Sequence, residues 1–339
     1  MSKSRVKPRY FAIALLPVCV FAIHKLIQNQ MIANELDVPV NFVLSGSSWQ
    51  EAVGRFRFLA ASWFFLSLAL LPVAVLFRTL SRPIEKNTRI AAIAIVVAIV
   101  FLALVPTIQK HMTDQSPQIY HQIGKAVFET ALSQGTLPAC SGSEDSWMFG
   151  KCGQAPVLSL FNRILDLVNA MAGLAIGSLI VGMILCLGRH ESQDIEATAA
   201  ELAQNLRQMR QQLYLSSLVL TFGMFFAASW MYWPLPMIAE SERAAYSALL
   251  NASALFTGTY FCLLMLSYFL PVAVLLDGRI SNLALAARNQ GGTDQTFDID
   301  DWRSSHKLTE GTGDIIRAGF ALTAPILAAF AGGISPILG

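Results

Sequence analysis

The stretch IAAIAIVVAIVFLALVPT, residues 90–107, decides the fold. It carries no charged side chain, and an α-helix of this length, at about 1.5 Å per residue, crosses most of a hydrocarbon core of about 30 Å. The whole chain agrees with this feature, since 54% of its residues are hydrophobic, 14% are charged and the mean hydropathy is +0.52. A soluble domain is more polar than this. The sequence therefore predicts an integral membrane protein.

Other apolar windows of spanning length complete a bundle of six predicted transmembrane helices. They cover about residues 10–27, 58–77, 164–187, 213–235 and 253–276. The fold class that this pattern predicts is all-α, a polytopic membrane helix bundle. The apolar C-terminal segment 315–339 is a seventh span, a re-entrant hairpin or a docked helix, because Gly332, Gly333 and Pro336 would interrupt a helix near its end.

These windows divide the chain into three parts. Residues 1–277 form the six-span bundle, with an outer cap at 108–160 and a cytoplasmic helix at 193–212. Residues 278–314 form a cytoplasmic helix and an acidic linker, and 315–339 the apolar segment. In the cap, Ser116, Pro117 and Gly135 mark the ends of a short amphipathic helix, whose apolar stripe holds Ile119, Ile123 and Val127.

The basic residues predict the orientation of the chain. Segments 1–9, 78–89, 189–210 and 279–317 hold most of the 24 lysines and arginines, and lie on one side of the membrane if there are six spans. Lysine and arginine near span ends are retained on the cytoplasmic side. We therefore expect a cytoplasmic N-terminus in a bacterial inner membrane, and with six spans both termini lie in the cytoplasm.

A proline-centred phrase recurs in the predicted spans. LPVAVL occurs at residues 71–76 and 270–275, and LPVCV at 16–20. Because proline removes a backbone donor, Pro17, Pro72 and Pro271 are predicted to bend their helices. The recurrence reflects either an internal duplication or chance within a chain rich in leucine, alanine and valine.

Two cysteines bracket an outer loop, CSGSEDSWMFGKC. Cys140 and Cys152 are predicted to form a disulfide, since this loop faces an oxidising compartment in the expected orientation. The alternatives are two free thiols or a metal pair, but no histidine or third cysteine lies nearby in the sequence to complete a zinc site.

Two patterns predict contacts between helices. Gly173, Gly177, Ser178 and Gly182 recur at helical spacing in the fourth span and favour close contact with another helix, either within the chain or between subunits. A heptad seam precedes the fifth span. Its members are Ile195, Ala199, Leu202, Leu206, Met209 and Leu213.

The seam predicts a protruding helix at 193–212. Two kinds of partner are candidates for packing on the seam. One is the amphipathic helix that follows the sixth span in the same chain, and the other is a separate chain, either a cytoplasmic protein or a second copy. The acidic linker beyond that helix is predicted to be solvated, because it lacks the ligand spacing of a calcium-binding loop.

Ionisable residues are almost absent from the predicted spans. Asp166 is the one acid within them, and it forms either an interfacial ion pair with Arg163 or a functional carboxylate. No motif predicts catalytic residues, a bound metal or a cofactor. The net charge of +2 indicates no nucleic-acid partner, so the expected partner is the lipid bilayer.

Two functional hypotheses follow. The first is a non-enzymatic membrane effector or channel component, for example a toxic or defence effector, controlled by a cytoplasmic partner. The second is a transporter of a neutral or lipophilic solute, suggested by proline bends at one depth. A cavity lined by the helices that carry Pro72 and Pro271 would favour transport, whereas a solid bundle would favour the effector. A membrane-bound enzyme is the more distant alternative.

Overall fold

The computed structural model describes residues 5–32, 48–113, 119–135, 156–189, 194–290, 298–309 and 311–334. Most residues in these ranges are helical, and the one bridge between extended residues that they contain joins Arg5 to Arg189. The protein is an all-α polytopic helix bundle.

Seven helical segments in the described part of the chain are long and apolar enough to cross a membrane. Their helices are α1 (Leu15–Ile27, between a 3-10 segment η1, Pro8–Ala14, and a π-helical turn η2, Gln28–Ile32), α2 (Ser48–Leu80), α3 (Lys86–Thr113), α5 (Pro156–Leu185), α6 (Ile195–Tyr232), α7 (Glu240–Gln290) and α9 (Thr312–Ile334). The shorter elements are α4 (Ile119–Ser133), η3 (Leu235–Met237) and α8 (Ile299–Ser305). Apolar side chains such as Trp63, Phe101 and Phe320 are exposed on the outer surface, as expected for contact with lipid.

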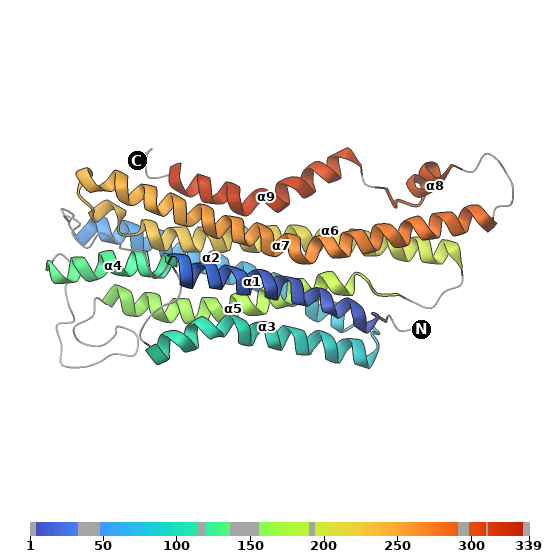
Figure 1. Ribbon diagram of the computed structural model, residues 1–339, viewed down its shortest axis with the longest axis horizontal. Helices are drawn as coiled ribbons and strands as arrows, with labels where there is room; N and C mark the ends of the chain where they lie inside the picture. Colours follow the sequence, from blue (N-terminus) through green and yellow to red (C-terminus); the bar gives the residue numbers. More distant parts are fainter. Residues whose placement is uncertain are drawn as a thin grey trace.

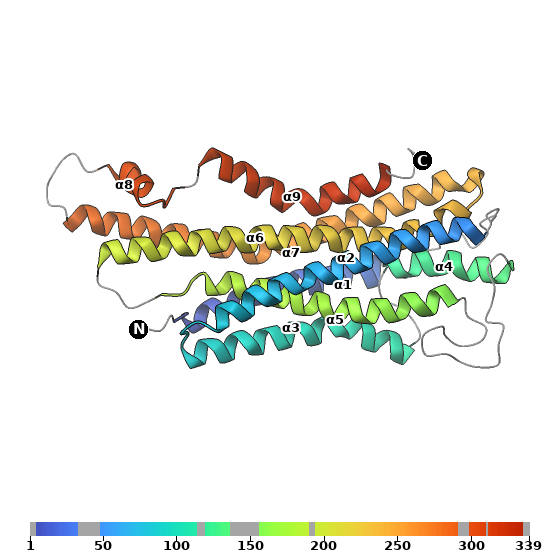
Figure 2. The same cartoon turned by 180° about the vertical axis from the view of Figure 1, so that it is seen from behind.

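The long helices lie side by side along one axis (Figures 1 and 2). We call the end at which α4 lies the cap end, and the end at which η1 lies the η1 end. The helices alternate in direction, so α2 ends and α3 begins at the η1 end, while α5 begins at the cap end. The order of residues along each helix therefore gives their depth in the bundle.

The C-terminal helix α9 is the seventh described helix that is long and apolar enough to span a membrane. It packs along α6 and α7, and it starts at the η1 end and ends at the cap end (Figure 1). A Cβ atom on Gly258 of α7 would lie 2.9 Å from the carbonyl oxygen of Pro325, so the two backbones approach as closely as glycine allows. The first span thus begins at the η1 end and the last span ends at the cap end, as in the seven-span alternative and unlike the six-span version with both termini on one side.

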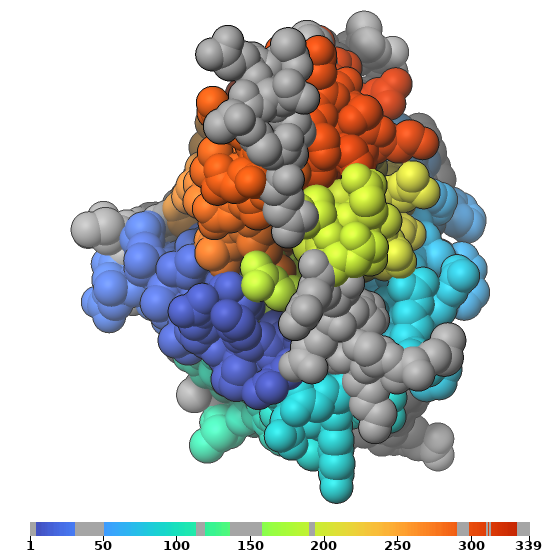
Figure 3. All heavy atoms as spheres, turned by 90° about the vertical axis from the view of Figure 1, so that its right-hand side faces the viewer, coloured from blue at the N-terminus to red at the C-terminus, as the bar shows by residue number. Residues whose placement is uncertain are grey.

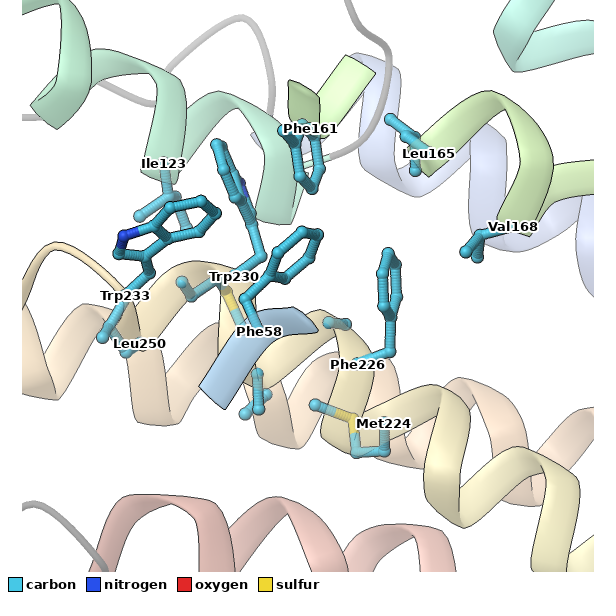
Figure 4. Packing of buried hydrophobic residues seen from close by; sticks show 14 of the residues in the cluster. Phe58, Ile123, Phe161, Leu165, Val168, Met224, Phe226, Trp230, Trp233 and Leu250 are labelled. Atoms are coloured by element: carbon cyan, nitrogen blue, oxygen red, sulfur yellow. The ribbon is translucent and has the colours of Figure 1, made fainter. Parts of the chain in front are cut away.

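An aromatic core fills the bundle near the cap end (Figure 4). Phe161 of α5 stacks on Trp230 of α6 with ring centroids 3.5 Å apart, and Phe58 of α2 stacks on Trp233 at 5.1 Å. Helix α4 lies against this core through the stripe expected from the sequence, since Ile119, Ile123 and Val127 are buried. It is followed by Gly135 at a φ of 68°, the left-handed conformation that suits glycine.

Glu51 in the first turn of α2 contacts Trp233 of this core, which lies 182 residues further along the chain. The Trp233 indole N–H donates to a Glu51 carboxylate oxygen at 2.9 Å, and Arg55 pairs with the same carboxylate. Because Glu51 is buried, these two partners satisfy a charge that would be costly alone.

A second apolar core lies toward the η1 end. Five of the seam residues on α6 are buried, and Ile195 is half-buried. The same cluster contains Leu276 and Ile280 of α7, so the seam packs on the helix of the same chain that the sequence indicated. In the view onto this end, the first turns of α6 (yellow-green) lie beside the last turns of α7 (orange) (Figure 3).

The two LPVAVL copies do not occupy matching environments. Pro72 and Leu76 are buried in α2, whereas in α7 Val272 and Leu276 are buried and Pro271 is half-buried. The buried positions of the second copy are therefore shifted by one residue along the phrase relative to those of the first copy. This difference favours chance recurrence over duplication.

Candidate functional site

A cavity of about 200 Å³, partly open to the outside, lies among the helices of the bundle. Residues of α1, α2, α3, α4, α5, α6 and α7 line it. By their order along the helices, Pro17, Ile180, Leu220 and Leu264 are the lining residues nearer the η1 end, which we call the deep end of the cavity, whereas Tyr120 belongs to α4 at the cap end. For comparison, an engineered cavity of about 150 Å³ in another protein's core stays dry and binds benzene.

The cavity arises because α1 and α3 pack on different partners. On α5, Gly173 and Gly177 face α3, and a Cβ atom on Gly173 would lie 2.6 Å from the Cβ atom of Ala103. Helix α1 instead packs on α7, where the His24 ring stacks on Tyr260 at 3.9 Å and on Phe256 at 4.9 Å. Space remains between α1 and the pair α3–α5, and both sides of that space line the cavity.

The wall of the cavity is amphiphilic. Its nitrogen-bearing side chains are His24, Lys25, Gln28 and Asn169; the first three lie in the last turn of α1 and the first residue of η2, and Asn169 lies near the middle of α5. The deep end is formed by aliphatic side chains and proline. A ligand with an apolar body and one polar group matches this distribution.

A polar cluster lies between α3 and α5, close to Asn169 in the cavity lining. Lys110 Nζ lies 2.7 Å from one Asp166 oxygen, and His111 Nε2 lies 3.2 Å from the other. One turn along α5, the Asn169 amide donates to Thr107 Oγ1 at 2.9 Å. The carboxylate therefore pairs across helices with Lys110 and His111, where the sequence had suggested Arg163 or a functional role. In this arrangement Asp166 joins α5 to α3 through its ion pairs.

Two residues at the start of α4 connect the cavity to the aromatic core. Tyr120 lines the cavity, and burial raises the pKa of its hydroxyl group, which stays protonated. His121 is buried and stacks on Phe161 at 4.9 Å. Burial, with smaller contributions from Lys110 and Lys125, lowers the pKa of His121 to about 3, so the ring is neutral at physiological pH.

The prolines predicted to bend helices are placed differently from one another. Pro17 lines the cavity in the first turn of α1, where a missing N–H costs little. Pro72 and Pro271 lie within α2 and α7, which line the cavity through other residues, namely Phe65 on α2 and Tyr260 among others on α7.

The other predicted residues have structural positions. Ser178 is buried and its hydroxyl donates to the Leu174 carbonyl oxygen at 2.7 Å, while Gly182 approaches Gln212 of α6. The predicted disulfide between Cys140 and Cys152 lies outside the described residues and stays a prediction. In the described ranges, Cys186 and Cys262 are buried thiols.

Sequence reasoning missed the polar face of α1. His24 and Lys25 fall at the end of the predicted span 10–27, and the sequence pattern assigned them no role. The available signal was spacing, because positions 24 and 28 lie four residues apart with position 25 beside them, which places all three on one face of a helix. Across the described ranges, no three His, Cys, Asp or Glu residues are grouped so that they could hold a metal ion.

Comparisons of the chain with protein-family models, curated proteins and solved structures found no match. The apolar helices define an integral membrane protein, and its cavity is the candidate functional site.

Proposed function

We propose that the protein is a membrane transporter whose substrate is a small lipophilic molecule. The observation that carries this proposal is the cavity between α1 and the pair α3–α5. It lies within the spanning part of the bundle and is lined mainly by apolar side chains. The helices that carry Pro72 and Pro271 contribute residues to its lining. Transporters bind their substrates near the membrane midplane, where interrupted helices meet.

Filling the cavity tests the proposal. Gly223 lines it, and a Cβ atom there would meet Phe65 at an ordinary 3.4 Å, so in Gly223→Leu the larger side chain extends into the empty space. Saturable binding of tritiated decanol to purified protein in nanodiscs should be lost in this variant. The matched control is Gly278→Leu on α7, where a Cβ atom has nothing within 4 Å. Equal binding by wild type and both variants would contradict the proposal.

Transport also requires that the cavity open and close, and α1 is the helix suited to that motion. It packs chiefly on α7, and its side chains Ile23 and Leu26 are exposed. Spin labels at Ile23 and at Val97 of α3, both exposed positions, should report a shifted distance distribution when decanol is added. A distribution that does not change would favour static binding.

A second proposal is the membrane effector controlled by a cytoplasmic partner or a second copy. The observation that favours it is that α6 and α7 extend past the other helices at the η1 end (Figure 1). There α8 attaches through ion pairs of Arg303 with Asp277 at 2.7 Å and His306 with Glu196 at 3.0 Å. If the effector proposal holds, expression should collapse the membrane potential reported by a potential-sensitive dye. A normal potential at high expression would contradict it.

We further propose that the η1 end faces the cytoplasm of a bacterial cell. Basic residues on η1, at the α2–α3 connection and on α7 lie at this end, including Arg9, Arg82, Arg89 and Arg279. A reporter active only in the cytoplasm should be active when fused after Gln211 and silent after Gln134. The reverse result would contradict the orientation.

A further inference from the structure

The polar end of the cavity contains one cation whose hydrogen-bonding capacity is only partly used. Lys25 Nζ donates to Gln28 Oε1 at 2.9 Å, and an ammonium group has three N–H donors. No carboxylate in the described part of the chain forms an ion pair with it.

Its polar neighbours are engaged elsewhere. The His24 ring lies on Tyr260, and Asn169 donates to Thr107. Asp166, the acid at this end of α5, is paired with Lys110 and His111. An ammonium group on the wall of a largely apolar cavity within a spanning segment is costly unless an anion accompanies it. The wall thus presents a positive charge at one end and apolar surface at the other.

We infer that Lys25 receives the head group of a single-chain carboxylate amphiphile, of the class of medium-chain fatty acids, whose tail occupies the apolar depth of the cavity toward Pro17, Ile180 and Leu264. A carboxylate accepts charge-assisted hydrogen bonds from an ammonium group, and Gln28 supplies an amide N–H beside it. The inference rests on the proposed function and adds the class of substrate. The competing role for Lys25 is extension toward the lipid–water interface, with its chain covering apolar surface and no ligand bound.

Binding of two ligands with the same tail separates these roles. Tritiated decanoate and decanol are measured at pH 7 on the full-length protein in nanodiscs of neutral lipid. Lys25→Met should weaken decanoate binding about 10-fold or more, the effect of one lost charge-assisted hydrogen bond, and change decanol binding by less than about 2-fold. Lys25→Arg should retain the preference for decanoate.

The matched control is Lys125→Met, because Lys125 lies on α4 outside the cavity lining and pairs with Glu129. It should leave both affinities unchanged. Unchanged decanoate binding in Lys25→Met, or an equal loss of both ligands, overturns the inference. Saturable decanol binding that Gly223→Leu removes, without any preference for decanoate, overturns the inference and leaves the proposed function standing. If neither ligand saturates wild type, both fail.

Discussion

The imidazole ring of His24 lies on the ring of Tyr260, with centroids 3.9 Å apart and 17° between the ring planes. These residues come from α1 and α7, and their contact fixes one wall of the cavity. Stacked aromatic pairs contribute about 0.5–1.5 kcal/mol beyond the area that they bury. In a double-mutant cycle of His24→Leu and Tyr260→Leu, the free energies of unfolding in detergent should therefore show a coupling of about 1 kcal/mol. Strictly additive changes would show that the stacking does not hold α1 on α7.

The pair of Lys110 and Asp166 should stabilise the cap end of α3 and α5. Their side chains are 10% and 22% exposed, so Asp166→Asn leaves a lysine with little water and no carboxylate. We expect a loss of about 2 kcal/mol in the free energy of unfolding. Glu129→Gln is the control, because the Lys125–Glu129 pair is more exposed, at 37% and 54%, and should cost less than about 1 kcal/mol. Similar losses in both variants would contradict the assigned role of Asp166.

His121 should make the protein less stable as the pH falls. An unfolded histidine takes up a proton near pH 6.5, whereas the folded pKa of His121 is about 3, so below pH 6.5 the unfolded state binds a proton that the folded state does not. Stability is thus fully present above pH 6.5 and decreases by about 2 kcal/mol at pH 5. Denaturant titrations between pH 8 and pH 5 measure this. His121→Phe, which keeps a ring against Phe161, should flatten the profile, and an equally steep profile in that variant would assign the effect to other groups.

Gly258 should be required for the docking of α9. A larger side chain there meets the Pro325 carbonyl oxygen and the Ile326 Cα atom, so Gly258→Leu should destabilise the protein by about 1–3 kcal/mol. Gly319→Leu adds the same side chain on α9 where nothing lies within 4 Å of the Cβ position, and it should be neutral. Thermal unfolding of the two variants provides the measurement. If both melt like wild type, α9 does not depend on this contact and is free to move away from the bundle.

The sequence predicted most of the spanning helices because their signal is local. An uncharged run such as 90–107 needs no tertiary information to be assigned to a membrane, and Gly135 marked the end of α4 through the chemistry of helix ends. Ser116 and Pro117, expected at its start, lie outside the described residues. Helix α8 was missed within the predicted linker. Its seven residues are too few for a periodic pattern, and it is marked only by the Asp298 side chain, which accepts from the Asp300 N–H at 2.8 Å.

The cavity could not be predicted from the sequence because it depends on which helices become neighbours. The small residues Gly173 and Gly177 predicted a close contact with another helix, but the sequence did not indicate that this helix is α3. Nothing local indicates that His24 meets Tyr260, far away in the chain. Lys25 looked like an ordinary basic residue at a span end until the fold placed it in the lining of the cavity.

The most direct test of the account is photolabelling of the protein in nanodiscs with a decanol derivative that carries a diazirine. If the bundle contains a ligand site, labelling should be saturable, should be reduced by excess decanol and should map to cavity residues such as Phe21, Ala103, Ala172 and Gly223. Labelling that never saturates and is confined to lipid-facing residues such as Val97 and Phe101 would show that no ligand enters the cavity, and would contradict the account.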